Sequence, residues 1–307
     1  MLNILHEDAD LLVVNKPAGL VCHPTKGDEF SSLISRARLY LHSSLSANEV
    51  AGKVVCDLQP SAFSLQPCLV NRLDRETSGV VLIAKNSETA GELGKILEAR
   101  AVQKEYLAIV HGHVHDDHGL IDAPLGKDER SIVAVKDCVR PDGVPSQTEF
   151  FVERRFVRSS DVTIGECQKV GGTFPLSARE TGGEGRGEVG LPSTFDPRLS
   201  TSLSTINSQL STYSLLRVIP RTGRKHQIRL HLAHLGHPVV GDKLYGGDED
   251  LYLALVENRL TDEQRARLIL PNQALHARAL RFVWRGRPVE FSCAPEPWFS
   301  NFSAADL

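Results

Sequence analysis

The residues with the clearest chemical potential lie in a short polar loop that runs from Asn71 to Gly79 with the sequence NRLDRETSG. An aspartate in such a loop is commonly a turn residue that accepts hydrogen bonds from nearby backbone amides. Here Arg72 and Arg75 flank Asp74, and a neighbouring guanidinium lowers the pKa of a carboxyl group and keeps it ionised. An ionised carboxylate on a well-supported loop can act as a nucleophile or stabilise developing positive charge. Asp74 is therefore the first candidate for a catalytic residue.

Four histidines later in the chain raise the question of a metal site: His226, His231, His234 and His237. Zinc-protease histidines lie four residues apart on a helix with a glutamate between them, and that pattern is absent here. His231 and His234 can share a helix face, but no adjacent acid or cysteine supplies a third ligand. We expect no metal, and interpret these histidines as residues that pack a helix or contact a ligand.

The motifs of several common enzyme classes are missing. The sequence has neither a phosphate-binding G-x-x-x-x-G-K-[ST] loop nor a G-x-G-x-x-G turn after a strand, so nucleotide-dependent chemistry is disfavoured. It also lacks the G-x-S-x-G turn of α/β-hydrolases. We expect no nucleotide or other cofactor.

The composition is that of a soluble globular protein: 307 residues, of which 41% are hydrophobic and 24% charged. No run of about twenty apolar residues occurs, so we expect no membrane span, and the N-terminus lacks a secretory signal. The six cysteines include no Cys-x-x-Cys pair, which fits reduced thiols. We therefore expect a cytoplasmic location.

Positive charge is concentrated in one part of an otherwise slightly acidic chain. The formal net charge is −3, which argues against nucleic-acid binding through overall charge. Between Asp196 and Asp242, however, there is no acidic residue, and the basic residues there are Arg198, Arg217, Arg221, Arg224, Lys225 and Arg229. Such a local surface can bind a polyanion, because screening limits the effect of distant charges to about 8–10 Å. The alternative is an ordinary solvated basic face.

The elements that must position these residues alternate irregularly between strands and helices. Apolar runs predict strands at 11–14, 69–70, 80–84, 104–110 and 213–218, and a strand pair within 274–291 around the turn 285–287. Helices are predicted after Ser87, interpreted as an N-cap, and over 225–235, where Gly236 suits the C-terminal cap. This order favours an α+β fold with a mixed, largely antiparallel central sheet flanked by helices and loops.

A change in composition marks residues 159–212. This segment is rich in Gly, Ser and Thr and poor in large apolar residues, so we interpret it as a mobile surface insertion rather than a domain boundary. It could serve as a substrate lid or be a loop without function. We expect residues 1–307 to form one catalytic domain that carries this insertion, without a separate N-terminal domain.

Several blocks together resemble one enzyme family. The loop 72–79 resembles the signature loop of the RluA-type RNA pseudouridine synthases. The segments 15–19, 104–106, 221–231, 236–238, 241–242 and 275–277 are similar to further family blocks in the same order, and cover most of the chain outside the insertion. The resemblance implies an enzyme that isomerises specific uridines in structured RNA, ribosomal or transfer, without a metal or organic cofactor, and we expect a monomer.

The resemblance also implies roles for particular residues. Asp74 would be the catalytic aspartate, Tyr106 would lie beneath the target uracil and help to remove the proton from C5, and Arg229 would pair with Asp74. Arg72 would enter the RNA and hold the target base out of its stack, and Leu275 would pack near the pocket. The block around Arg229 adds substrate-binding candidates: Arg221, Arg224, Lys225, His226 and Gln227.

The sequence departs from the family pattern at two places. Position 71 is Asn where the family usually has His, and we expect altered hydrogen bonding behind the site rather than lost activity. The insertion 159–212 is also atypical. Two other functions remain open: a catalytically lapsed RNA-binding relative, and a glycosidic-bond hydrolase that would use Asp74 with a second acid such as Asp242, at a separation of about 5–10 Å.

Overall fold

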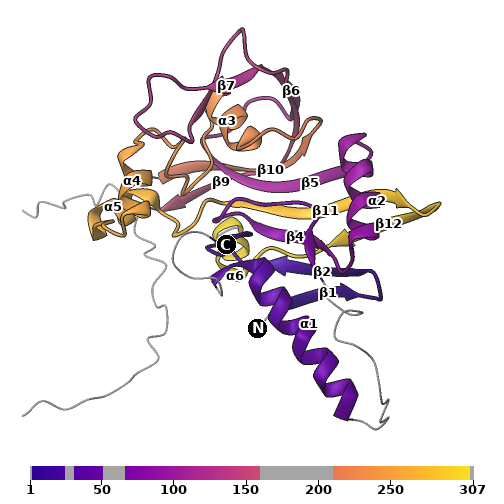
Figure 1. The fold of residues 1–307 in the computed structure, drawn as a ribbon. Coiled ribbons are helices and arrows are strands. Elements are labelled where there is room, and N and C mark those ends of the chain that lie inside the picture. Colours follow the sequence, from indigo (N-terminus) through magenta and orange to yellow (C-terminus); the bar gives the residue numbers. More distant parts are fainter. Residues whose placement is uncertain (1, 25–30, 51–65, 160–209, 305–307) are drawn as a thin grey trace, which may run out of the picture. The chain divides into compact units, whose positions relative to one another are not determined.

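A mixed ten-stranded sheet organises the computed structural model, which describes residues 2–24, 31–50, 66–159 and 210–304 (Figure 1). Its strands are β1 (Asn3–Glu7), β2 (Leu11–Lys16), β3 (Cys68–Leu69), β4 (Ser78–Ala84), β5 (Gln103–His111), β6 (His118–Asp122), β9 (Gln147–Ser159), β10 (Leu210–Pro220), β11 (Leu275–Trp284) and β12 (Arg287–Ser292). The main path is β1-β2-β4-β11-β5-β10-β9-β6, with β12 beside β11 and β3 beside β4.

The sheet is antiparallel at most of its junctions. Among the strand pairs whose register is described, only β4 and β11 run parallel, where Ser78 lies opposite His276. The short strands β7 (Leu125–Lys127) and β8 (Asp137–Val139) form a separate two-stranded sheet. The predicted α+β class with a largely antiparallel sheet is confirmed.

Six helices accompany the sheet in the described residues. They are α1 (Leu33–Val50), α2 (Ser87–Glu98), α3 (Gln227–His234), α4 (Asp250–Val256), α5 (Asp262–Leu268) and α6 (Pro297–Ser303). Residues 1–157 and 212–307 group into one compact unit. The segment 158–211 forms its own unit, and the predicted insertion lies outside the described residues except at its edges.

The N-terminal strands are apolar on both faces because helices cover both. One face carries Leu12, Val14, Val81 and Ile83, and the other carries Leu11, Val13, Val80 and Leu82. Leu33 of α1 packs with the first set, and Leu93 of α2 packs with the second. Full burial of one such side chain contributes about 1.5–3 kcal/mol to folding, so these two layers hold β2 and β4 firmly.

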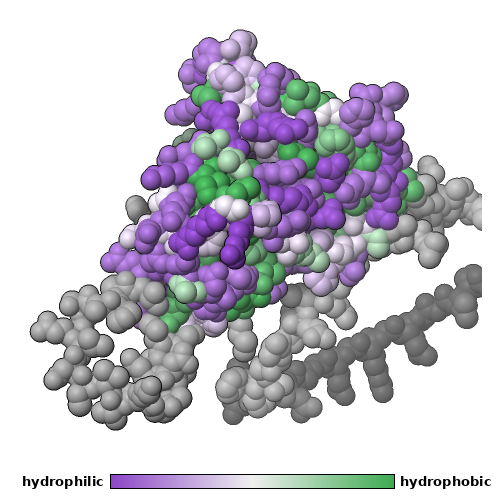
Figure 2. Space-filling model, turned by 90° about the vertical axis from the view of Figure 1, so that its right-hand side faces the viewer, coloured by the Kyte–Doolittle hydropathy of each residue, from purple (hydrophilic) through white to green (hydrophobic). Residues whose placement is uncertain are grey.

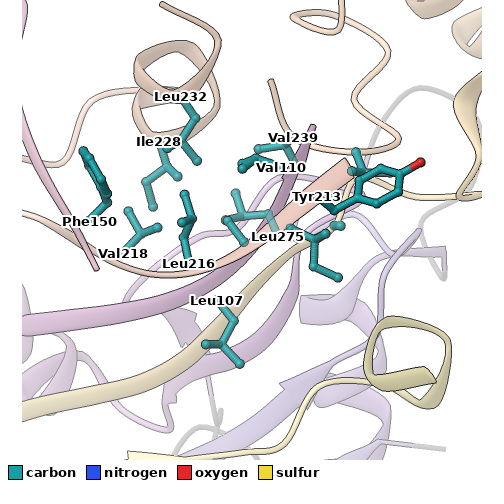
Figure 3. Close-up of a cluster of buried hydrophobic side chains, with 14 of the residues drawn as sticks. Leu107, Val110, Phe150, Tyr213, Leu216, Val218, Ile228, Leu232, Val239 and Leu275 are labelled. Carbon is teal, nitrogen blue, oxygen red and sulfur yellow. The ribbon is translucent and has the colours of Figure 1, made fainter. Parts of the chain in front are cut away.

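Helix α3 packs against the C-terminal half of the sheet. Figure 3 shows Ile228 and Leu232 pointing from α3 toward Leu216 and Val218 of β10. Gly236 adopts a φ of +88° just beyond the helix, as the predicted C-terminal cap requires. The 3.6-residue spacing of the apolar side chains explains why this segment forms a helix although it lies between two sheet-forming segments.

The start of α2 differs from the prediction by one residue. The N-cap is Asn86, whose side-chain oxygen accepts a hydrogen bond from the Thr89 amide at 2.8 Å, and Ser87 is the first helical residue. Asn and Ser are about equally good caps, so composition alone does not choose between neighbours.

The surface is predominantly polar on the face that Figure 2 displays, with hydrophobic residues interspersed among hydrophilic ones. Within the described ranges, no helix is both long and apolar enough to cross a membrane.

Candidate active site

A cleft of about 870 Å³ opens beside the loop between β3 and β4. It is lined by all ten residues that the sequence predicted for the site: Arg72, Asp74, Tyr106, Arg221, Arg224, Lys225, His226, Gln227, Arg229 and Leu275. These residues come from the 70–77 loop, from β5, from the segment between β10 and α3, and from the start of β11. The fold thus brings together residues up to about two hundred positions apart in sequence.

The loop that carries Asp74 is held from below by polar contacts. The Nζ of Lys16, a fully buried residue, donates hydrogen bonds to the carbonyl oxygens of Pro17, Leu20 and Arg75 at 2.9, 2.8 and 3.0 Å. The amide of Thr77 donates to the Asp74 carbonyl at 3.2 Å. A buried ammonium is tolerated when all its hydrogen bonds are satisfied, and Lys16 satisfies three. The Asp74 backbone is therefore fixed before any ligand binds.

Arg229 joins Asp74 to a second carboxylate. Its Nη1 donates to Oδ2 of Asp74 at 2.8 Å, while its Nε and Nη2 donate to the two oxygens of Asp242 at 2.7 and 2.9 Å. Asp242 also accepts hydrogen bonds from the amides of Leu244 and Tyr245. Because bidentate pairing fixes the plane of a guanidinium, Asp242 orients Arg229 toward Asp74.

These contacts set the charge of Asp74. Burial raises the pKa of its carboxyl group, but the charge of Arg229, the interaction with His226 and hydrogen bonds from Arg229 and Gln273 together outweigh burial, and the net pKa lies below the ordinary value of 3.8. The Asp74 side chain keeps 31% of its surface exposed, whereas that of Asp242 is 0% exposed. Asp74 is therefore an ionised carboxylate at neutral pH that a ligand in the cleft can reach.

Tyr106 lies at the centre of the sheet, on β5, opposite Val218 of β10 and Ala277 of β11. Its ring packs against two apolar clusters and its side chain lines the cleft. Burial raises the pKa of its phenol well above the ordinary value of 10.0, and the negative charge of Asp74 raises it further. Tyr106 is consequently a neutral phenol at neutral pH, and its flat ring forms part of the floor of the cleft.

His226 stands at the N-terminus of α3 with a left-handed φ of +53°. Its Nε2 lies 3.8 Å from Oδ1 of Asp74, and its Nδ1 is 3.1 Å from the hydroxyl of Tyr245. Burial lowers the pKa of the imidazole below its ordinary value of 6.5, although the negative charge of Asp74 opposes this shift.

The predicted RNA-binding cations fall into two groups. Arg221 is already paired with Glu149 at 2.7 Å, and Lys225 with Asp137 at 3.1 Å. Arg72 and Arg224 are exposed, and neither forms an ion pair with any carboxylate in the described part of the chain. Unpaired guanidinium groups keep their full capacity for phosphate or base contacts.

Gln227 is placed differently from the prediction of a substrate contact. Its side chain is buried, and its Oε1 accepts hydrogen bonds from the Thr222 hydroxyl and the Arg224 amide at 2.7 and 3.0 Å. Its Nε2 donates to the Gln147 carbonyl and the Thr148 hydroxyl, each at 2.9 Å. These bonds use both donors and both lone pairs of the amide, so Gln227 braces the wall of the cleft that it lines, and its contact with a substrate stays a prediction. Leu275 is buried at 4% exposure and supplies an apolar contact to the same cleft.

Two supports of the Asp74 loop were not found from the sequence. The Nζ of Lys243 donates to Oε1 of Glu76 at 2.7 Å, and the amide nitrogen of Gln273 donates to the Thr77 hydroxyl at 2.6 Å. All four side chains are buried. The sequence offers little signal for such pairs, because partners separated by 167 and 196 positions are joined only by the folded sheet.

Asn71, the departure from the family pattern, ties the loop to β4. Its Nδ2 donates to the Val80 carbonyl at 3.2 Å, and its Oδ1 accepts from the Leu82 amide at 2.7 Å. The Asn side chain thus continues the backbone hydrogen bonding of β4, a local function that requires one donor and one acceptor.

The histidine positions give no metal geometry. His231 is fully buried, with Nδ1 2.8 Å from the Thr148 hydroxyl and Nε2 2.9 Å from the Ala123 carbonyl, so both ring nitrogens are occupied. The expected packing role is confirmed for His231. Among the residues whose placement is described, no group of three potential ligands of the His, Cys, Asp or Glu type occurs.

Comparisons with known proteins agree with this geometry. The chain matches the family described as RNA pseudouridylate synthase over residues 10–234. It is 32% identical over 298 residues to ribosomal large subunit pseudouridine synthase D of Xanthomonas campestris, and 29% identical over 298 residues to an RNA pseudouridine synthase of Bacillus subtilis. Each alignment covers 96% of this chain.

The relatives are longer than this chain. The chain spans 66% of the length of the Xanthomonas relative, 69% of the Bacillus relative and 56% of a third, from Aquifex aeolicus. Among solved structures, the human RNA pseudouridylate synthase domain containing 4 shares the fold, with a TM-score of 0.57 at 23% identity, covering 97% of this chain and 90% of that one. The family match includes the Asp74 loop, β5 and α3, and the chain therefore belongs to the RNA pseudouridylate synthases, in the RluA-type family that its motifs resemble.

Proposed function

We propose that this protein isomerises uridine to pseudouridine in RNA, with Asp74, Tyr106 and Arg229 as its catalytic residues. The observation that carries the proposal is the ionised Asp74, bound by the buried Arg229 at 2.8 Å and facing a cleft that Tyr106 also lines. A carboxylate that is both ionised and accessible suits attack on a sugar or stabilisation of its positive charge.

The reaction asks for few functional groups. The N1–C1′ bond breaks, the uracil turns, and C5 forms the new bond to C1′, so atoms are neither gained nor lost. No energy source or cofactor is then required. Asp74 carries the negative charge at the sugar, and Arg229 holds that carboxylate ionised and oriented throughout. C5 loses a proton and N1 gains one, so no proton is consumed overall; Tyr106, a neutral phenol, relays this proton by taking it from C5 while its own hydroxyl proton passes through water to N1.

Entry of the substrate requires that the target nucleotide leaves its stack, which costs a few kcal/mol. Arg72 is exposed at the cleft and forms no ion pair within the described residues, so its guanidinium is available to take the place of the everted base. We assign the RNA-binding wall to Arg72, Arg221, Arg224, Lys225 and His226, with Leu275 as an apolar contact and Gln227 as their support.

The substrate class proposed is ribosomal RNA, because the Xanthomonas relative is named for the large ribosomal subunit. Transfer RNA is the alternative. We further propose action as a monomer without a cofactor in the cytoplasm.

The hydrolase alternative is disfavoured by the position of Asp242. A two-carboxylate mechanism needs both acids at the substrate. The Asp242 side chain is 0% exposed and both its oxygens are bound by Arg229, so it cannot reach a sugar or a water in the cleft.

The test replaces Asp74 by Asn, which keeps size and hydrogen bonding but removes the charge. Release of tritium from RNA labelled at C5 of uridine is expected to fall to background, while RNA binding persists. The matched control is Asp116→Asn at an exposed position, which should retain wild-type turnover. Wild-type turnover by Asp74→Asn would contradict the mechanism, and no tritium release by the unmodified protein would favour an RNA-binding relative without activity.

A further inference from the structure

Lys104 lies on the same face of the sheet as Tyr106 and precedes it by two residues on β5. Side chains alternate along a strand, so Lys104 and Tyr106 point to the cleft and both line it. Glu105, between them, points to the opposite face, where its carboxylate lies 3.6 Å from Arg278 and 3.0 Å from Arg281. On this strand, the acidic side chain of Glu105 therefore points away from the cleft, and the basic side chain of Lys104 points into it.

The ammonium group of Lys104 is half-buried, and no carboxylate forms an ion pair with it in the part of the chain that is described. Burial lowers the pKa of Lys104, and no neighbouring negative charge opposes that shift. A partly desolvated cation without a counterion is unfavourable. The ammonium of Lys104, beside the candidate active site, is therefore available to pair with an anionic group of a ligand.

The surroundings of Lys104 are positive and open. Eight Lys and Arg side chains line the cleft, of which Arg221, Lys225 and Arg229 are paired with carboxylates. The other five form no ion pair within the described residues, and the lining carboxylates there are Glu98 and Asp74, which is paired with Arg229. The Nζ of Lys104 lies 3.6 Å from the position that a side chain on Gly223 would occupy. Because Gly223 has no side chain, no side chain at position 223 lies against the ammonium of Lys104.

We propose that Lys104 binds a backbone phosphate of the RNA strand, next to the nucleotide whose base enters the cleft over Tyr106. The inference rests on the proposed function, since it takes the substrate to be RNA. A lysine ammonium binds phosphate as a compact point charge without a fixed orientation. Phosphate contacts set the register of a nucleic acid on a protein. Lys104 is thus a substrate-positioning residue, which fixes the position of the RNA strand relative to Asp74.

The experiment compares Lys104→Gln, Lys104→Arg and the control Lys95→Gln. Lys95 is an exposed residue of α2 outside the cleft, so its change removes one positive charge without altering the lining of the cleft. Binding of fluorescein-labelled oligouridylate is measured against salt concentration. Each lost phosphate contact to a single strand lowers the slope of log K against log salt by about 0.7.

Lys104→Gln is expected to lower that slope by about 0.7 and to raise the KM for unmodified ribosomal RNA by about tenfold, with kcat nearly unchanged. Lys104→Arg should restore the slope, and Lys95→Gln should leave the slope and turnover as in the wild type. An unchanged slope for Lys104→Gln overturns the proposal, as does a loss confined to kcat. If the wild type releases no tritium, the proposed function fails, but the salt slope still decides whether Lys104 binds phosphate.

Discussion

Asp242 accepts two hydrogen bonds from Arg229, from Nε at 2.7 Å and from Nη2 at 2.9 Å, and this leaves Nη1 for Asp74. The pair is buried on both sides, with 7% of the Arg229 side chain and 0% of the Asp242 side chain exposed. The buried carboxylate of Asp242 therefore fixes the guanidinium of Arg229, and that guanidinium in turn fixes the more exposed carboxylate of Asp74. Asp242 acts on the site through Arg229 without meeting a substrate.

Asp242→Ala is expected to lower the free energy of unfolding by about 3–5 kcal/mol, because it removes the acceptors of Nε and Nη2 of the buried Arg229 and leaves Asp74 as the remaining carboxylate partner. Turnover should fall as well, since Arg229 loses its orientation. Urea unfolding and tritium release measure the two effects. Asp142→Ala removes a carboxylate that pairs with Arg140 at the surface and should barely change the unfolding midpoint. Equal destabilisation by both variants would show that the buried Arg229–Asp242 pair contributes no more to stability than the surface Arg140–Asp142 pair.

The same pair predicts a dependence of stability on acid. Burial raises the pKa of Asp242, but Arg229 and two backbone amides outweigh burial and hold the folded-state pKa below 3.8. As the pH falls, the unfolded chain therefore binds a proton at Asp242 before the folded protein does. The contribution of Asp242 to stability is complete above about pH 5 and is lost as the pH falls through the folded pKa. The difference in urea midpoint between wild type and Asp242→Ala should be constant from neutral pH to about pH 5 and narrow below about pH 4. A difference independent of pH would contradict this assignment.

Tyr106→Phe keeps the ring in its apolar setting but removes the hydroxyl. We expect kcat to fall by about 10²–10⁴, the usual range for loss of a proton-transfer group, while RNA binding and the unfolding midpoint stay close to wild type. Tyr252→Phe, on helix α4 and outside the cleft, is the matched control. Retention of full kcat by Tyr106→Phe would restrict Tyr106 to a packing role.

Lys16→Met should loosen the Asp74 loop. It removes the donor to three carbonyl oxygens, among them that of Arg75, and each buried acceptor left unsatisfied costs about 1–3 kcal/mol. The expected result is a lower unfolding midpoint, faster hydrogen exchange in the 73–77 loop and reduced kcat. Lys95→Met at an exposed position should change none of these. Exchange in the loop at the wild-type rate would mean that Lys16 does not hold it.

Gly79→Ala tests the parallel junction of β4 with β11. Gly79 has a φ of +121°, and a Cβ there would lie 2.2 Å from the Ala277 carbonyl oxygen. We expect a protein that is severely destabilised or does not fold, as judged by thermal unfolding. Gly91→Ala, in α2 where a Cβ meets nothing within 4 Å, should instead stabilise by about 0.5–1 kcal/mol. Tolerance of both substitutions would disprove the close approach of the two strands.

Much of the fold could be predicted from the sequence where a strand or helix is apolar in a regular pattern. The strands at 11–14, 80–84, 104–110 and 213–218 and the helix of Arg229 were predicted for this reason, and the structure contains all of them. Helix α1 was missed although Ser32 caps it, accepting a hydrogen bond from the Ser35 amide at 3.3 Å. Leu33, Ile34, Ala37 and Leu41 form its buried face, but Leu39 is 51% exposed on the other side and blurs the apolar pattern. The short strands β7 and β8 were missed because three residues carry too little pattern.

The residues of the candidate site were predicted because of the family resemblance, while their roles beyond direct contact were not. Asp242 was considered as a second acid at a substrate, and its burial gives it another function. Gln227 was expected to touch RNA, but its neighbours in space use its amide fully. Lys104 could have been found, since it lies two positions before Tyr106 on a predicted strand and so shares its face.

The hydrogen bonds around the Asp74 loop have a consequence for synthesis of the protein. The partners of Asp74, Glu76 and Thr77 follow 155, 167 and 196 positions later in the chain. At a translation rate of about 5–20 residues per second, the loop leaves the ribosome many seconds before Arg229, Lys243 and Gln273 exist. A nascent chain, or one cut short by premature termination, thus carries the carboxylate without its counterion. We therefore expect the loop to have no activity toward RNA until the residues up to Gln273 have been synthesised.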